Sequence, residues 1–183
     1  MIIWPEIQPI LQDGNLTLRP TTPLDAADMF SYINGDVEIS TFTTVPADYT
    51  LEMANEAVER WTSGYVEKTV MQNAICINDG PIIGQISLQN ISHRDHHAEI
   101  GYLLNADFRG QGIMTRAVSL LCDYAFGIGF RRLGAFAMPR NFGSVKTLEK
   151  NGFTREAVLR NYITELDGTQ TDAILFSKIN QSY

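Results

Sequence analysis

The sequence has little cysteine and no long apolar run. Only two of its 183 residues are cysteines, Cys76 and Cys122, and neither has neighbours at the spacing of a metal site or a disulfide framework. Both lie in apolar stretches, so we expect reduced core thiols. The start of the chain lacks the basic and apolar segments of a signal peptide, and no later run is long enough to cross a bilayer. A cytoplasmic protein is the simplest expectation.

Basic residues are also fewer than acidic residues. There are 14 Lys and Arg against 21 Asp and Glu, which gives a formal net charge of -7 and a pI near 4.9. Long-range attraction to nucleic acid or to an anionic membrane is therefore not expected as the basis of function. A cationic or amine-bearing partner is favoured instead. Hydrophobic residues make up 44% of the chain, which suits one globular domain over residues 1–183, with an irregular leader over residues 1–15.

Apolar residues recur at both strand and helix spacing. Strands are predicted at 16–20, 70–77, 81–88, 99–104, 133–137, 158–164 and 173–178. Helices are predicted to open at 22–25 and to cover 51–63, 114–126 and 144–150. Gly64 is expected to end the second helix, and the Thr-rich segment before that helix is expected to be irregular. Asn78-Asp79-Gly80 is a strong hairpin signal. These patterns predict a mixed α+β sheet with helices on its faces.

A glycine-rich loop separates the strand at 99–104 from the helix that follows. Arg109-Gly110-Gln111-Gly112 leaves successive backbone N–H groups unpaired where the helix dipole adds positive potential, so the loop can cradle a pyrophosphate. Arg109 can add a charge-assisted contact. Two glycines before a helix are on their own more often a turn. The loop is not a P-loop, because no Gly-Lys-Ser/Thr follows, and it is not a dinucleotide fingerprint, because the third glycine is missing.

The loop resembles the acetyl-CoA loop of the GNAT superfamily, Arg/Gln-x-x-Gly-x-Gly/Ala, with Met114 at the sixth position. Further matching stretches are Ala98 to Leu104, Phe108 to Ala117, Asn141 to Ser144 and Leu148 to Phe153. Together they are similar to the RimJ/RimL-type branch, whose members often carry Gly-Gln-Gly-x-Met-Thr. The resemblance implies a mostly antiparallel twisted sheet of about six to seven strands flanked by about four helices, and an N-acetyltransferase that uses acetyl-CoA as cosubstrate without a metal.

The resemblance also implies which residues contact the cosubstrate. In the family, the strand here spanning Tyr102 to Leu104 splays from its neighbour, so that its backbone pairs with pantetheine amides and polarises the acetyl carbonyl. The residues expected to bind the cosubstrate are Leu103, Leu104, Arg109, Gly110, Gln111, Gly112, Ile113, Met114, Thr115 and Asn141. For Asn141, whose other role would be a turn residue, we favour the contact to pantetheine because the whole Asn-x-x-Ser unit matches.

Acetyl transfer to an amine needs a base to deprotonate the amine and an acid to protonate the leaving thiolate. Glu99 is the candidate base, acting through ordered water; its alternative is a surface carboxylate or a structural partner of an arginine. Ser144 is the candidate acid, because many relatives carry a tyrosine on the short helix where this chain has Leu148. Ser144 could equally cap that helix, and both roles can hold at once.

The residue pattern leaves the acetyl acceptor open. A protein N-terminal α-amino group, as in ribosomal-protein acetyltransferases, is the leading expectation, because its reference pKa is near 8 and it needs little help from a base. A small amine such as a polyamine, an aminoglycoside or an amino-acid derivative is the alternative, and a non-catalytic acyl-CoA-binding module is a third. A homodimer is left open. His93, His96 and His97 share a loop with Asp95, which we interpret as solvated and not as a metal site.

Overall fold

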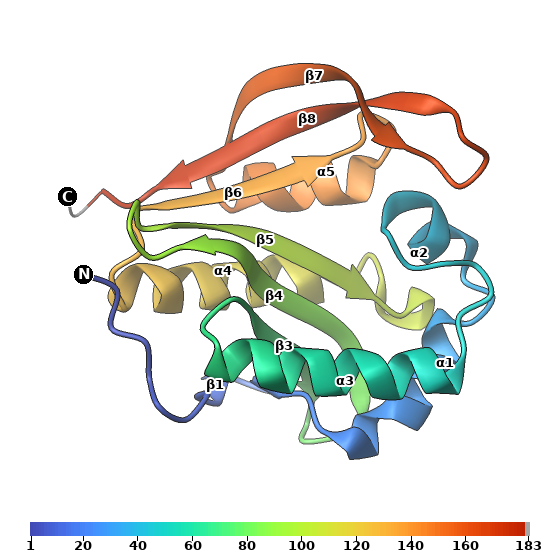
Figure 1. Ribbon diagram of the computed structural model, residues 1–183, viewed down its shortest axis with the longest axis horizontal. Coiled ribbons are helices and arrows are strands. Elements are labelled where there is room, and N and C mark those ends of the chain that lie inside the picture. The colour runs from blue at the N-terminus through green and yellow to red at the C-terminus, as the bar shows by residue number, and fades with distance from the viewer. Residues whose placement is uncertain (182–183) are drawn as a thin grey trace.

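The computed structural model describes residues 1–181 as an eight-stranded mixed sheet with helices on both faces (Figure 1). The strands are β1 (Leu11–Asp13), β2 (Leu16–Pro20), β3 (Met71–Ile77), β4 (Ile82–Ser92), β5 (His97–Leu104), β6 (Arg132–Ala137), β7 (Thr154–Thr164) and β8 (Gln170–Ile179). The α-helices are α1 (Ala26–Ile33), α2 (Val37–Phe42), α3 (Leu51–Val66), α4 (Ile113–Gly127) and α5 (Phe142–Lys150). Two short 3-10 helices are η1 (Pro23–Asp25) and η2 (Ala106–Phe108). The α+β prediction is confirmed.

The sheet has the order β1-β2-β3-β4-β5-β6-β8-β7. Among the described strands, neighbours run antiparallel except for β5 and β6, which run parallel. These two strands pair only where His97–Glu99 meets Arg132–Gly134. Beyond these residues the two strands no longer pair with each other, and Figure 1 shows them diverging. The sheet is therefore open along the second half of β5.

The helices pack on opposite faces of the sheet and define two apolar clusters. Residues of β3 alternate between them: Ala74 and Cys76 pack with α1 and α3, whereas Met71 and Ile75 pack with the cluster that includes α4 and α5. This alternation follows from the two-residue period of a strand that is covered on both sides. Cys76 and Cys122 are buried free thiols, and burial raises the pKa of Cys122 to about 12.

Two elements correct the sequence prediction, and they bring the described counts above the expected six to seven strands and four helices. Strand β1 lies inside the leader at 1–15, which was expected to be irregular, and pairs with β2. Helix α2 lies in the Thr-rich segment, which was also expected to be irregular. The Asp36 side chain caps it by accepting a hydrogen bond from the Ile39 backbone N–H at 3.0 Å. Both elements are short, so sequence periodicity is a weak signal for them.

Gly64 does not end α3, which continues to Val66. A Cβ atom at Gly64 would lie 2.5 Å from Cγ1 of Val70. The glycine therefore permits a close approach of the chain that leaves the helix, and the reversal follows at Lys68, whose φ is +61°. The predicted glycine stop after α5 is confirmed, because Gly152 has a φ of +75° and its N–H donates to the carbonyl of Glu149.

Candidate active site

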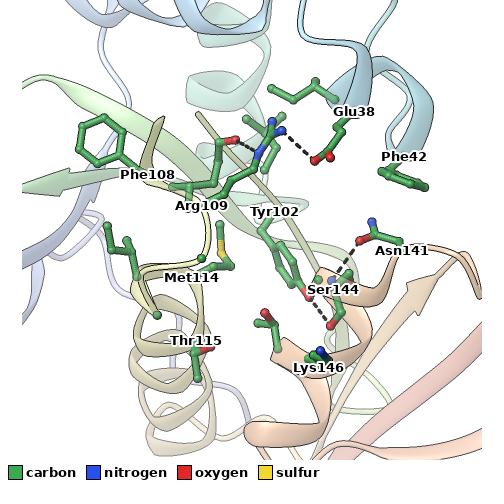
Figure 2. Close-up of a pocket in the computed structure, with 18 of the residues that line it drawn as sticks. Glu38, Phe42, Tyr102, Phe108, Arg109, Met114, Thr115, Asn141, Ser144 and Lys146 are labelled. Carbon is green, nitrogen blue, oxygen red and sulfur yellow. Dashed lines mark hydrogen bonds and ion pairs between the residues drawn. The ribbon is translucent and has the colours of Figure 1, made fainter. Parts of the chain in front are cut away.

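A cavity of about 320 Å³ lies where β5 and β6 diverge. Its walls come from α2, the second half of β5, the glycine loop with the first turn of α4, and α5 (Figure 2). The lining residues are Glu38, Ile39, Phe42, Thr43, Tyr102, Leu103, Leu104, Phe108, Arg109, Gly110, Gly112, Ile113, Met114, Thr115, Asn141, Gly143, Ser144, Lys146, Thr147 and Lys150. The unpaired edge of β5 therefore faces a hollow that several elements enclose.

The glycine loop has the backbone shape that a phosphate cradle needs. Gly110 and Gly112 have φ values of +74° and +77°, in the left-handed region that favours glycine. A Cβ atom at either position would meet nothing within 4 Å, so the space above the backbone is open. Gly112 is the N-cap of α4 and has no side chain to cap its first turn. The N–H groups of that turn face the cavity with the positive end of the helix dipole. This part of the chain fits a pyrophosphate.

The Arg109 side chain turns away from that cradle and ties the loop to α2. Its Nε donates to the Leu104 carbonyl at 3.0 Å, and its two terminal nitrogens lie 2.5 Å from an Asp36 carboxylate oxygen and 2.8 Å from Glu38 Oε2. The same Asp36 caps α2 with its other oxygen. Arg109 therefore holds α2 against the cavity, and its charge is already paired.

Two hydroxyl groups meet inside the cavity. The Tyr102 phenol oxygen lies 2.9 Å from Ser144 Oγ, and Figure 2 shows the two side chains facing one another from β5 and α5. Asn141 is the N-cap of α5 and accepts a hydrogen bond from the Ser144 backbone N–H at 3.0 Å. Burial raises the pKa of Tyr102 to about 12, although the hydrogen bond to Ser144 lowers it. The capping oxygen comes from Asn141, so the Ser144 hydroxyl remains for another partner.

Two of the predicted site residues lie outside the cavity lining. Glu99 stands on the paired part of β5, opposite Gly134 of β6, and its Oε2 accepts a hydrogen bond from Asn90 Nδ2 at 2.7 Å. Gln111 is exposed, and its amide donates to the Asp107 carbonyl. The other predicted residues, Leu103, Leu104, Arg109, Gly110, Gly112, Ile113, Met114, Thr115, Asn141 and Ser144, all line the cavity.

Sequence reasoning missed the contributions of three elements. The Tyr102 side chain lies on the face of β5 that also carries Ile100 and Leu104, and this alternation was a usable signal. Lys146 and Lys150 are spaced by four residues on α5 and line the cavity together, as helical geometry requires. Helix α2 had no such signal, because its place depends on Arg109, more than 65 residues away.

The histidine loop forms hydrogen bonds of its own. Asp95 and Ser92 bond one another through side chains and backbone, and His93 Nε2 lies 2.8 Å from the Lys68 carbonyl oxygen. Across residues 1–181, no group of three or more His, Cys, Asp or Glu side chains is placed to hold a metal ion. Over the same residues, no helix is long and apolar enough to span a membrane.

The comparisons with known proteins agree on the family. Residues 15–154 match the family described as the acetyltransferase (GNAT) domain. The Bacillus subtilis protein called probable N-acetyltransferase YjcK is 30% identical over 177 residues, which cover 93% of this chain and 97% of that protein. The spermidine N(1)-acetyltransferase of Escherichia coli is 29% identical over only 82 residues, which cover 44% of each chain.

Solved structures show the same fold. The ribosomal-protein-S5-alanine acetyltransferase from Vibrio fischeri has a TM-score of 0.84 and 26% identity, with 95% of this chain and 98% of that chain covered. RimL, a ribosomal L7/L12 α-N-protein acetyltransferase solved with coenzyme A, has a TM-score of 0.89 and 20% identity, with 96% and 100% covered.

The chain therefore belongs to the GNAT acetyltransferase family. It is an acetyl-CoA-dependent N-acetyltransferase, and its structural neighbours are of the RimJ/RimL type.

Proposed function

We propose that the acceptor is the α-amino group of a protein N-terminus. The observation that carries this proposal is that no unpaired carboxylate stands among the described residues that line the cavity. Glu38 is the one carboxylate among the described lining residues, and it is paired with Arg109. Glu99 lies outside the lining and is hydrogen-bonded to Asn90. A site without a strong general base suits an amine that is already partly neutral.

The reference pKa values separate the two kinds of protein amine. At pH 7.5, about a third of α-amino groups are neutral, against about one in a thousand lysine side chains. Deprotonating a lysine rather than an α-amine costs about 3–4 kcal/mol more. The Vibrio fischeri neighbour named for ribosomal protein S5 alanine supports the same acceptor class, because its name refers to a protein substrate.

The cosubstrate supplies the acetyl thioester. In this proposal, Gly110, Gly112 and the first turn of α4 hold its pyrophosphate with backbone N–H groups. The unpaired edge of β5 at Leu103 and Leu104 pairs with the pantetheine arm, as does Asn141. Ile113, Met114 and Thr115 form the rest of that wall. Gln111 contributes only its backbone, since its side chain is exposed and bonded to Asp107.

Proton movement is assigned to two side chains. Glu99 receives the acceptor's proton through water, because it lies outside the cavity lining and direct contact is not required for an amine of low pKa. Ser144 lies inside the lining and donates a proton toward the sulfur that leaves. Both roles remain proposals that substitution can test.

A polyamine is the second candidate, favoured by the partial match to a spermidine acetyltransferase. The charges around the cavity weigh against it. Among the described lining residues, Glu38 is the one acid and is paired with Arg109, which leaves Lys146 and Lys150 as the basic residues that give the cavity its charge. This balance attracts phosphates, but it does not attract an acceptor that carries two or more positive charges.

The experiment is release of free thiol from acetyl-CoA in the presence of N-terminal peptides that begin with Ser, Ala or Thr. The matched control is each peptide with a blocked α-amine and an internal lysine, and spermidine and an aminoglycoside form a parallel panel. We expect release only with free N-termini, and mass spectrometry should locate the acetyl group on the α-amine. Release with spermidine but not with any peptide would move the function to small amines.

A further inference from the structure

Tyr102 of β5 and Ser144 of α5 make a direct hydroxyl-to-hydroxyl contact in the cavity. The residues are 42 positions apart, and their hydroxyl oxygens are 2.9 Å apart. The Ser144 carbonyl is a second, longer neighbour of the phenol, at 3.4 Å. Both residues line the cavity. A phenylalanine would fill the same space on this largely apolar face of β5, so packing alone does not explain the hydroxyl of Tyr102.

Either hydroxyl could donate in this contact, and the acidities of the two groups favour the phenol as the donor. A phenol titrates near pH 10 and a serine hydroxyl far above that, so the phenol is the stronger donor. When Tyr102 donates to Ser144 Oγ, the serine proton is free to point elsewhere. The Asn141 side chain already caps α5, so this proton is not needed at the helix terminus.

We propose that Tyr102 is a positioning residue that aims the Ser144 hydroxyl proton at the sulfur atom released in acetyl transfer. When the C–S bond breaks, its electron pair stays on sulfur. Ser144 then gives its proton to sulfur, Tyr102 gives its proton to Ser144 Oγ, and water returns a proton to the phenolate. The proton that the amine loses restores the balance with solvent.

The pKa of Tyr102, raised to about 12 by burial, keeps the phenol protonated throughout the working pH range. The pair is therefore always available as a donor. A serine hydroxyl that also accepts a hydrogen bond is a better donor than one that does not, because chained hydrogen bonds polarise one another.

Other titratable groups face this pair from the surrounding elements. They are Glu38 of α2, Arg109 of the loop, Cys122 of α4, and Lys146 and Lys150 of α5. The test therefore compares two ligands that carry the same phosphates and differ only at the sulfur.

Coenzyme A and desulfo-coenzyme A meet that requirement, because they differ only in the thiol. We would measure both dissociation constants by calorimetry from pH 7 to about pH 10. Ionised sulfur gains a charge-assisted hydrogen bond, so the preference of the wild type for coenzyme A should grow about fivefold to tenfold as the thiol ionises. In Ser144→Ala the preference should be independent of pH, and in Tyr102→Phe it should grow by less than in the wild type. A preference that grows as much in Tyr102→Phe as in the wild type overturns the proposal.

Kinetics give a second readout. Tyr102→Phe should lower kcat several-fold without raising the KM for acetyl-CoA, and it should have little further effect in the Ser144→Ala background, because the two hydroxyls act in series. Tyr65→Phe is the matched control: its phenol donates to the Pro5 carbonyl at 2.8 Å, outside the cavity lining. Additive effects of the two cavity variants contradict the proposal. If Tyr102→Phe fails to fold, Tyr102→Met, which also removes the hydroxyl, takes its place in both tests.

The inference rests on acetyl transfer from acetyl-CoA and on the donor role proposed for Ser144, and not on the identity of the amine. The binding test contains no acceptor, so its failure is distinguishable from failure of the N-terminal acceptor proposal.

Discussion

Replacing Arg109 by methionine is expected to loosen α2 and weaken binding of acetyl-CoA. The change removes the hydrogen bonds to the Leu104 carbonyl, Asp36 and Glu38. The Asp36 side chain is 11% exposed, whereas that of Glu38 is 65% exposed. Hydrogen bonds to charged groups contribute about 1.5–3 kcal/mol each when protected, and exposed ion pairs contribute about 0–1 kcal/mol. We therefore expect the free energy of unfolding to fall by about 2–4 kcal/mol. Most of this loss comes from the hydrogen bonds of Arg109 to Asp36 and to the Leu104 carbonyl.

The loss should be local, because α2 has only six residues and depends on this tie. Hydrogen exchange measured by mass spectrometry should show faster exchange over residues 37–42, and urea unfolding should give the change in free energy. The KM for acetyl-CoA should rise, since α2 forms one wall of the cavity. Glu38→Gln is the graded control and should cost less than about 1 kcal/mol. Unchanged exchange over residues 37–42 in the methionine variant would refute the reasoning.

Three further results are expected. Gly112→Glu should sharply weaken binding of acetyl-CoA, because a side chain at φ +77° is strained and a carboxylate would enter the phosphate cradle. Calorimetry on the folded variant measures the affinity, and an unchanged affinity would rule out the cradle. Burial acts to raise the pKa of Asp25, but the bonds from Arg19 prevail and lower it. The stability from Asp25 is thus present above about pH 4 and is lost as pH falls through the lowered pKa. Urea unfolding of Asp25→Asn should therefore show a deficit of about 3 kcal/mol in the free energy of unfolding at pH 7 that shrinks as the pH falls below about 4; a constant deficit would argue against this linkage. Gly64→Ala should cost about 1–2 kcal/mol because its Cβ would lie 2.5 Å from Val70, and in a Val70→Ala background the cost should largely vanish.

The order of the elements could be predicted because hydrophobic alternation and turn residues act over short stretches of chain. The hairpin at Asn78-Asp79-Gly80 is an example: the first two residues have φ values of +52° and +54°, as their side chains permit. The end of α5 at Gly152 is another. Both features depend on a few neighbouring residues, which the sequence displays directly.

Features that depend on distant partners could not be predicted in the same way. Gly64 was expected to stop a helix, but the helix continues, and only the position of Val70 explains why a glycine stands there. The loop glycines were identified from their motif, but the direction of the Arg109 side chain depends on α2. The contact of Tyr102 with Ser144 joins a strand to a helix across the cavity, and no local pattern relates the two positions.

The short pairing of β5 with β6 also has a mechanical consequence. The sheet consists of two blocks, β1 to β5 and β6 to β8, whose strands are hydrogen-bonded to one another across only three residue pairs. The cavity lies at this seam, with walls from both sides of it. A molecule seated there bridges the blocks and takes up backbone groups that would otherwise lack a strand partner. In the proposed arrangement the pantetheine arm takes up these backbone groups of β5, so binding of the cosubstrate would also link the two blocks of the sheet.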